Sequence, residues 1–522
     1  MKEKLMKRIF ILIVVVLIIT AIVIVATQNK KQPDQIAQTA EEKQYGTELR
    51  IGISALDTFD PIVSTNKNVQ DVCKLIYEPL LTINEKFKIQ GVLAEEWAKT
   101  AENSYIIKLK QGVKWHNGNE FTAMDVQFTI NKIKQENINS IYKQNVQNIA
   151  NITIVDNYTI KLDLLKEEPF FEYNLIFPIE CASDYQNGGI QIPSGTGIYK
   201  IYQIGTEKIE LVRNQYKQNV ENIQLKSIII KNYETMGELY NDFKIGNVDI
   251  INTDNIEYTN YIGTLGYTTR NFYGRDFNFL AINTKQIALY NIEVRKAISY
   301  AIDKNAIVAN VYNNKYYTAD YPLDYENWLY ADDSTSSGYN PEQSKKILQD
   351  NGWEYKNQIW QKNINNQNVQ LVFNLIVNSN DELRLKVAEN IKQQLEEIGM
   401  KINIVKVSST KSYISNKNYD IALLEMSIGV APDLSSFFGE NNLANYENQD
   451  AMKIIEELKD IKDENLLKEK YNKLLEIYKG DIPYISLYFS SSVLIYNSKL
   501  IGTINPTWYN LFYNIESWKI EQ

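Results

Sequence analysis

Histidine and cysteine are the residue types that this chain has least of. Its 522 residues include one histidine, His116, and two cysteines, Cys73 and Cys181. A zinc site would therefore need acidic residues or the distant cysteines as its other ligands, and two cysteines do not make a disulfide framework. The sequence leaves open whether the two cysteines pair, and we expect both to behave as small buried apolar side chains.

Motifs of catalysis and cofactor binding are also missing. The chain contains no G-x-S-x-G, G-x-x-x-x-G-K-[ST], G-x-G-x-x-G, H-E-x-x-H or C-x-x-C sequence. A Ser-His-Asp hydrolase would have to use His116 as its base, yet a lone histidine in a turn such as 113–118 is more often structural. We therefore expect a binding protein with no metal and no cofactor, and keep an extracellular hydrolase as an alternative.

Glycine and proline are sparse, at 22 and 11 residues. With no repeat at a period of about 20–50 residues, collagen-like, proline-rich and solenoid architectures are excluded. The formal net charge is −9, so the composition does not provide the basic face of a nucleic-acid-binding protein, and we expect no nucleic-acid partner. Hydrophobic residues make up 44% of the chain, which is typical of a globular protein, and the length predicts two or three structural lobes.

One long hydrophobic run lies near the N-terminus. Four basic residues within 1–8 precede an uninterrupted apolar or weakly polar run over 9–27, which as a helix nearly spans the ~30 Å hydrocarbon core of a bilayer. The basic residues predict a cytoplasmic tail at 1–8, and a transmembrane anchor or uncleaved signal follows at 9–27. We favour retention over cleavage because Val25-Ala26-Thr27 is a poor cleavage site. Residues 28–45, rich in Gln, Lys, Glu and Thr, are typical of a flexible stalk.

Beyond the stalk, strand-like and helix-like patterns alternate. Residues 122–125 have the Thr-x-x-Asp form of a helix start, and Asn340-Pro341 opens another helix that Gly352 ends. Arg295 and Asp303 suggest an ion pair or a set of caps on one helix. The alternation predicts a parallel or mixed sheet with helices on both faces. Strands are predicted over 49–54, 105–109, 158–164, 369–377, 401–407 and 419–424, and further helices over 69–81, 122–134, 292–312, 382–398, 449–460 and 464–478.

Six groups of short segments occur in a characteristic order. They are 76–81 with 93–97, 109–118 with 121–126, 193–199 with 211–214, 246–249, 294–303, and 339–344 with 352–353. In this order and spacing, the chain from about residue 48 onward resembles the extracellular solute-binding proteins of oligopeptide and dipeptide ABC importers, known as family 5. The stretch 109–118 with 121–126 is the closest match.

This resemblance implies an α/β fold, a two-lobed clamshell like that of periplasmic binding proteins with an extra subdomain, to which the sequence adds one N-terminal transmembrane helix. Lobe I is expected at 46–80, 194–285 and 485–522, the extra subdomain at 81–193 and lobe II at 286–484. The ligand is expected between the lobes, bound in part through backbone hydrogen bonds like an added strand.

The resemblance also suggests binding residues. In peptide-binding members an aspartate pairs with the amino group of the ligand, and the corresponding position here falls near Val430. The anchor is thus missing or replaced by Asp433, which could instead cap the following helix. The expected ligand-binding residues are Ser54, Ala55, Leu56, Met426, Ile428, Gly429, Val430 and Asp433, with Tyr273 and Trp508 as aromatic residues near the lobe junctions.

The function that the resemblance implies is capture outside the cell. A membrane-tethered receptor would bind a peptide or peptide-like solute and pass it to an ABC permease with its ATPase subunits. The identity of the solute stays open because the usual aspartate is displaced. A ligand-binding sensor or scaffold with the same fold, and with no role in transport, is the second hypothesis.

Overall fold

The structure, a computed structural model, describes residues 45–186, 192–205, 208–263, 266–330 and 338–522. The expected tail at 1–8, the anchor at 9–27 and nearly all of the stalk at 28–45 lie outside these residues. Within the described residues, no helix has both the length and the apolar character needed to cross a bilayer. Residues Gly46–Ile520 form one unit by their contacts, and every feature discussed below belongs to it.

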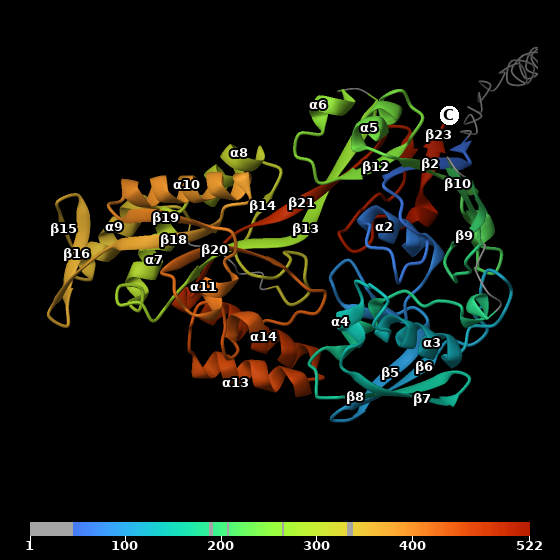
Figure 1. Ribbon diagram of the computed structural model, residues 1–522, viewed down its shortest axis with the longest axis horizontal. Helices are drawn as coiled ribbons and strands as arrows, with labels where there is room; N and C mark the ends of the chain where they lie inside the picture. Colours follow the sequence, from blue (N-terminus) through green and yellow to red (C-terminus); the bar gives the residue numbers. More distant parts are fainter. Residues whose placement is uncertain (1–44, 187–191, 206–207, 264–265, 331–337) are drawn as a thin grey trace, which may run out of the picture. The chain divides into compact units, whose positions relative to one another are not determined.

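The largest sheet of this unit has eleven strands and mixed directions (Figure 1). Ten strands follow the order β19-β18-β20-β13-β21-β12-β2-β11-β10-β9, and β14 pairs with β21 beside this path. The pairs β2–β11 and β18–β19 are parallel, whereas β13–β21 is antiparallel, so the expected mixed sheet is confirmed. The strands are β2 (Glu48–Ser54), β9 (Tyr199–Ile204), β10 (Lys208–Arg213), β11 (Ser227–Tyr233), β12 (Ile250–Thr253), β13 (Tyr267–Ile282), β14 (Tyr317–Thr318), β18 (Val372–Asn378), β19 (Lys401–Val407), β20 (Ile421–Ser427) and β21 (Tyr484–Asn497).

Strands β13 and β21 join the two halves of this sheet, and they run side by side in Figure 1. Their register shifts between Tyr273 and Phe277, which leaves an irregular segment in the middle of β13. Gly274 lies in this segment, and a Cβ atom there would be 2.3 Å from Ser490 Oγ on β21. Irregular pairing of this kind bends a strand and increases its local twist. We call residues 274–276, opposite Ser490, the strand interruption.

Helix α2 (Lys67–Ile76) packs beside β2 in the first half of the sheet. The side chain of Asn66 accepts hydrogen bonds from the first turn, which fixes the start of the helix. The helix ends at Ile76, not at 81 as expected, in keeping with the bias of the residue before Pro79 towards an extended conformation. A Cβ on Gly195 would be only 1.8 Å from the carbonyl oxygen of Ile76, so this glycine is required by close backbone packing against the helix end.

The expected single helix over 292–312 is two helices. They are α7 (Ile292–Ala301) and α8 (Lys304–Tyr312), and the break occurs at Asp303. The Asp303 carboxylate accepts a hydrogen bond from the backbone N–H of Ala306 at 3.0 Å and so caps α8. Arg295 donates to three backbone carbonyls instead of pairing with an acid, so of the two expected roles only the cap is present.

Two other predicted helices agree closely with the structure. Helix α9 (Pro341–Asp350) starts at Asn340, whose side chain accepts from the backbone of Gln343. Helix α10 (Glu382–Glu397) is followed by Gly399 with a φ of 90°, a left-handed conformation that favours glycine. Both helices contribute to the hydrophobic core around β18 and β19.

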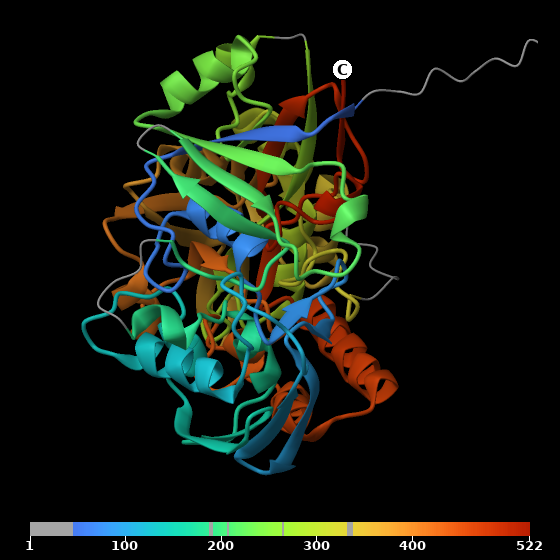
Figure 2. The ribbon, with the colours of Figure 1, turned by 90° about the vertical axis from the view of Figure 1, so that its right-hand side faces the viewer.

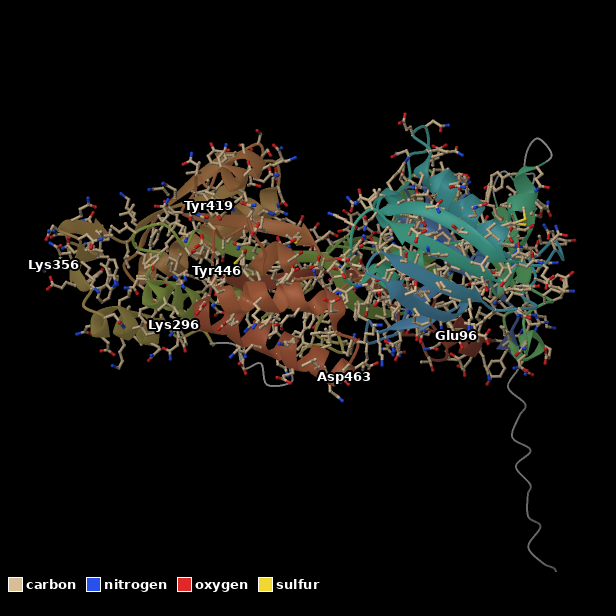
Figure 3. The ribbon with its side chains drawn as sticks, turned by 90° about the horizontal axis from the view of Figure 1, so that it is seen from below. Glu96, Lys296, Lys356, Tyr419, Tyr446 and Asp463 are labelled. Carbon is tan, nitrogen blue, oxygen red and sulfur yellow. The ribbon has the colours of Figure 1, made fainter. Side chains whose placement is uncertain are left out.

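A separate antiparallel sheet has the order β5-β6-β8-β7, and helix α3 lies against it (Figure 2). The strands are β5 (Ala94–Ala101), β6 (Ser104–Leu109), β7 (Ile149–Asp156) and β8 (Thr159–Leu164), and the helix is α3 (Ala123–Lys134). Thr122 and Asp125 form the predicted capping box. Figure 3 shows Glu96 on β5, an edge strand with an outward polar face.

The remaining elements are short strands that form smaller sheets, further helices that include the 18-residue α14, and short 3-10 helices. Additional strands are β1 (Tyr45–Gly46), β3 (Leu81–Ile83), β4 (Ile89–Gly91), β15 (Glu354–Lys356), β16 (Ile359–Ile364), β17 (Gln367–Gln370), β22 (Leu500–Ile501) and β23 (Lys519–Glu521). Additional helices are α4 (Lys143–Val146), α5 (Met236–Lys244), α6 (Thr259–Ile262), α11 (Lys411–Ser415), α12 (Ser435–Phe438), α13 (Gln449–Glu457) and α14 (Glu464–Asp481). Short 3-10 helices are η1 (Phe171–Ile176), η2 (Ala182–Tyr185), η3 (Val220–Asn222), η4 (Leu458–Asp460) and η5 (Ile515–Ser517).

Candidate ligand-binding cavity

A cavity of about 410 Å³ lies next to the strand interruption. Its wall combines parts of the chain that are far apart in sequence: a turn before β4, the middle of β13, the region of β14 and the segment after β22. A volume of this order suits a small solute. The lining residues are Glu85, Phe87, Arg270, Asn271, Phe272, Tyr273, Tyr317, Asp324, Glu326, Ile504, Asn505, Pro506, Thr507 and Trp508.

Aromatic rings form much of this wall. Tyr273 and Tyr317 are stacked, with ring centroids 4.1 Å apart and an interplanar angle of 23°. Their strands β13 and β14 both pair with β21, which brings the two rings together. On another part of the wall, Phe87 and Trp508 have centroids 5.9 Å apart. Such rings offer apolar contact area and electron-rich faces to a ligand.

Asp324 is the buried acid of the cavity. Its residue is only 5% exposed, and its Oδ1 atom has no hydrogen-bond partner among the described residues. Burial raises the pKa of Asp324 to about 7, and the nearby Trp508 N–H and Arg275 offset this only in part. An unpaired buried carboxyl group is unfavourable unless something outside the described residues satisfies it.

Trp508 has a matching unsatisfied group. The residue is 8% exposed, and its Nε1 atom has no hydrogen-bond partner among the described residues. The indole N–H faces the Asp324 carboxylate and lowers its pKa by hydrogen bonding, although the geometry is poorer than that of a regular hydrogen bond. The cavity wall therefore holds a donor and an acceptor that satisfy each other only weakly.

Two of the ten residues expected to bind ligand, Tyr273 and Trp508, line the cavity. Ser54, Ala55 and Leu56 do not line it. They lie at the end of β2, where the side chain of Asn66 donates to the carbonyls of Ser54 and Ala55. Their expected role in binding stays a prediction.

Four more expected residues lie at the end of β20 (Met426) and in the loop after it (Ile428, Gly429 and Val430), and none of them lines the cavity. The backbone N–H of Ile428 donates to the Arg275 carbonyl at 2.8 Å, and Arg275 Nε donates back to the Ile428 carbonyl at 3.1 Å. The guanidinium of Arg275 also lies over the Trp508 ring. The loop is thus connected to the cavity wall through Arg275.

Asp433 is exposed and points its carboxylate at its own loop. One oxygen accepts from the backbone N–H of Ser435 at 2.8 Å and the other from the Ser435 hydroxyl at 2.9 Å. These bonds form an Asx turn just before the short helix α12, whose N-cap residue is Leu434 and has no side-chain cap, so Asp433 does not take the capping position that was kept open for it. Asp433 is not among the residues that line the cavity.

His116 has a structural environment. The backbone N–H of Gly195 donates to Nδ1 at 3.0 Å, and Nε2 lies 3.2 Å from the Gly197 carbonyl, to which it donates in the matching tautomer. Burial lowers the pKa of His116 to about 4, so the ring is neutral at physiological pH. Because both ring nitrogens bind backbone, this histidine is not placed to act as the base of a hydrolase.

The cysteines are both free and buried, as expected for small apolar side chains. Cys73 belongs to the core around α2, and Cys181 to the core of the four-stranded sheet. Across the described ranges, no group of three or more His, Cys, Asp and Glu side chains is arranged to hold a metal ion.

Asp324 and Tyr317 are among the cavity-lining residues that sequence reasoning missed. Both lie between α8 and α9, in a stretch without a periodic pattern or a known motif. Asp324 is one of 64 acidic residues, and its burial depends on residues such as Trp508 that are remote in sequence. No local signal would have distinguished it.

Comparisons with known proteins agree with this fold. The family model described as bacterial extracellular solute-binding proteins, family 5 Middle, matches residues 88–447. The oligopeptide-binding protein AppA of Bacillus subtilis is 22% identical over 523 residues, with 94% of each chain covered. The structure of AppA from Bacillus subtilis in complex with a nonapeptide has a TM-score of 0.58 at 22% identity, covering 92% of this chain and 100% of that one. HbpA2 from Haemophilus parasuis has a TM-score of 0.77 at 20% identity, covering 91% and 100%. The chain therefore belongs to the bacterial extracellular solute-binding proteins of family 5.

Proposed function

We propose that this protein captures peptides or peptide-like solutes outside the cell and passes them to an ABC permease driven by its ATPase subunits. The observation that carries the proposal is the cavity beside the strand interruption, whose wall brings together stacked tyrosine rings, a buried acid and an indole N–H. The backbone of a peptide ligand carries groups that complement this wall, since it offers N–H donors, carbonyl acceptors and charged ends. The relative AppA, named as an oligopeptide-binding protein, supports this class of ligand.

The proposal includes a two-lobed clamshell that closes on its ligand. Lobe I would comprise 46–80, 194–285 and 485–522, the extra subdomain 81–193 and lobe II 286–484. The strand interruption would be the hinge, because β13 and β21 pair on both sides of it and their register changes within it. Closure around a ligand excludes water and strengthens polar contacts in the cavity.

The proposal also places the protein at the cell membrane. Residues 9–27 would cross the membrane once, with 1–8 inside and the binding unit outside, joined by the stalk at 28–45. The apolar run and the basic residues before it support this topology. Cleavage at the end of the run would release the binding unit, so the mass of the mature N-terminal peptide distinguishes an anchor from a removed signal.

Ligand binding can be tested on the full-length protein in detergent. A mixture of tripeptides with free ends should raise the melting temperature, because a ligand that binds only the folded state stabilises it by mass action. Incubation should leave the peptides intact, as judged by mass spectrometry. Cleaved products would favour the hydrolase, and a folded protein with no response to peptides would contradict peptide capture.

The transport role needs a cellular test. Deletion of the gene should reduce the uptake of labelled peptides that bind the purified protein, and the full-length gene should restore it. Unchanged uptake together with a changed transcriptional or signalling response to the same peptides would favour the sensor with this fold.

A further inference from the structure

Two loops of the cavity wall are joined by one backbone hydrogen bond. Glu85 and Phe87 line the cavity from the loop before β4, and Asp324 lines it from the loop after β14. Next to these residues, the backbone N–H of Trp328 donates to the Lys86 carbonyl at 3.0 Å. The first loop belongs to the proposed extra subdomain and the second to the proposed lobe II, so the wall opens at this bond when the two move apart.

A charged side chain strengthens this junction. Lys88 Nζ lies 2.6 Å from Glu464 Oε1 at the start of α14, and 5.7 Å from the centroid of the Trp328 ring. A cation near an aromatic ring is attracted to its face. The loop before β4 is therefore held both by Trp328 and by α14.

A second group of charges connects the same two parts of the protein. Glu167 lies 2.5 Å from Lys99 Nζ on β5 and 3.1 Å from Lys459 Nζ on η4. Lys99 Nζ also lies 3.6 Å from Asp460 Oδ1, and Lys459 Nζ lies 2.6 Å from Glu456 Oε1. Each lysine thus pairs with one acid of its own part and with one acid of the other part. The two lysines, Lys99 most strongly, hold the pKa of Glu167 below its ordinary value.

These contacts form a polar junction between two parts that have separate cores. One buried cluster comprises residues within 62–181, and another comprises residues within 277–489. We call the following residues the ionic junction: Lys88, Lys99, Glu167, Lys459, Asp460 and Glu464. Exposed ion pairs contribute little individually and are screened by salt, so the junction can break while both cores stay folded.

We propose that the ionic junction is a latch that regulates access to the cavity. When it is formed, the loops that carry Lys86 and Trp328 stay together and the exchange of solute is slow. When its charges are screened or removed, the loops part and exchange is faster. The inference rests on the proposed function and adds regulation of the same cavity. None of these described residues lines the cavity, so the latch sets how often it opens and leaves the shape of its wall unchanged.

Opening can be measured without a ligand, by hydrogen–deuterium exchange of the full-length protein in detergent. The Trp328 amide donates across the junction, so the peptide that contains it reports on opening. Glu167→Gln keeps the size of the side chain and removes the charge that two lysines share. The matched control is Glu96→Gln, also in the extra subdomain, which breaks an exposed 2.7 Å pair between β5 and β6. Circular dichroism confirms that each variant is folded.

At about 50 mM NaCl, the Trp328 amide should exchange about three- to tenfold faster in Glu167→Gln than in the wild type, and at the wild-type rate in Glu96→Gln. Raising NaCl to about 0.5 M should accelerate exchange in the wild type and in Glu96→Gln, and less in Glu167→Gln, because salt screens charges. Equal exchange in all three proteins, or the same response to salt in Glu167→Gln and the wild type, overturns the latch.

A charge reversal separates an effect of charge from a local loss of packing. Lys88→Glu places an acid opposite Glu464 and should accelerate exchange of the Trp328 amide. Addition of Glu464→Lys to Lys88→Glu restores an attractive pair and should recover part of the protection. A double variant that exchanges as fast as Lys88→Glu overturns a latch based on charge.

A second measurement separates the latch from the proposed function. A tripeptide mixture with free ends is bound to each protein, and its release on dilution is followed by tryptophan fluorescence. Release should be about threefold or more faster from Glu167→Gln than from the wild type and Glu96→Gln. Equal release from all three overturns the latch and leaves peptide capture intact. Absence of binding to the wild type overturns peptide capture, and the exchange of the Trp328 amide then decides on the latch alone.

Discussion

The guanidinium of Arg275 lies over the indole of Trp508, 4.6 Å from the ring centroid. Arg275 belongs to the strand interruption of β13, and Trp508 to the segment after β22 that closes one side of the cavity. Since the backbone carbonyl of Arg275 accepts from the Ile428 N–H and its side chain donates to the Ile428 carbonyl, this one residue connects three separate parts of the chain at the cavity wall.

Arg275→Ala should reduce the free energy of unfolding by about 1–2 kcal/mol, because it removes the cation–π contact and the bond from Nε to Ile428. Urea unfolding followed by tryptophan fluorescence measures the change. Arg275→Lys keeps a cation near the Trp508 ring, so its free energy of unfolding should fall by less than that of Arg275→Ala. A value for Arg275→Ala within about 0.3 kcal/mol of the wild type would show that the contact is energetically unimportant.

Gly274→Ala should destabilise the protein by about 1–3 kcal/mol, because the new Cβ atom would meet Ser490 Oγ at 2.3 Å and the Ser490 carbonyl oxygen at 3.0 Å. The matched control is Gly480→Ala in α14, where no atom lies within 4 Å of a Cβ and alanine favours the helix. Thermal unfolding should show a lower melting temperature for Gly274→Ala and a higher one for Gly480→Ala. Equal shifts of the melting temperature would contradict the steric explanation.

Asp324 should make stability depend on pH. The pKa of Asp324 is about 7 in the folded protein, whereas its ordinary value is 3.8. Between pH 3.8 and about 7, the folded state therefore keeps a proton that the unfolded state has released. The stabilising contribution is complete below about pH 4 and is lost as the pH rises through about 7. Asp324→Asn should therefore gain on the order of 2–4 kcal/mol over the wild type at pH 8, and less at pH 5. A difference that stays constant with pH, measured by urea unfolding without ligand, would be inconsistent with a buried titrating acid.

Lys132, near the end of α3, should contribute strongly to the stability of the protein. Its Nζ atom lies 2.5 Å from Asp60 Oδ2 and 2.8 Å from Glu180 Oε2, and it also donates to the Tyr185 hydroxyl at 2.8 Å. Burial raises the pKa of Glu180 to about 8, which Lys132 opposes. Lys132→Met leaves the buried acid without a cation and should cost about 3–5 kcal/mol.

The control for this cluster is Lys346→Met, which removes an exposed pair with Asp350 at 2.6 Å on α9. That change should alter stability by less than about 0.5 kcal/mol. A double variant Lys132→Met with Glu180→Gln should recover part of the loss. If both lysine variants behave alike in urea unfolding, burial does not govern the strength of the cluster.

Local signals were enough to predict much of the secondary structure. The capping box at Thr122 and Asp125 and the cap at Asn340 mark helix starts where the structure has them. These features depend on a few neighbouring residues, so the sequence contains all the information that is needed. The break at Asp303 was missed because apolar spacing continues through it, although an aspartate before a helical turn is itself a capping signal.

The cavity was harder to predict because it is made by long-range contacts. Tyr273 and Trp508 were identified as aromatic residues near a junction, but their neighbour Asp324 was not. Whether an aspartate is exposed or buried depends on what packs over it. For Asp324 this includes Trp508, which lies near the C-terminus of the chain. The register shift between β13 and β21 is equally invisible to a local pattern, since it depends on the pairing of two strands that lie far apart in the sequence.

The strand interruption lies beside the cavity, but none of its residues, 274–276, lines it. If the bend there sets the fraction of molecules that can accept a ligand, the apparent Kd equals the intrinsic Kd divided by that fraction. Substitutions at 274–276 or at Ser490 would then tune how tightly a solute is held without changing any residue that lines the cavity. Evolution could adjust sensitivity to scarce or abundant nutrients independently of chemical selectivity.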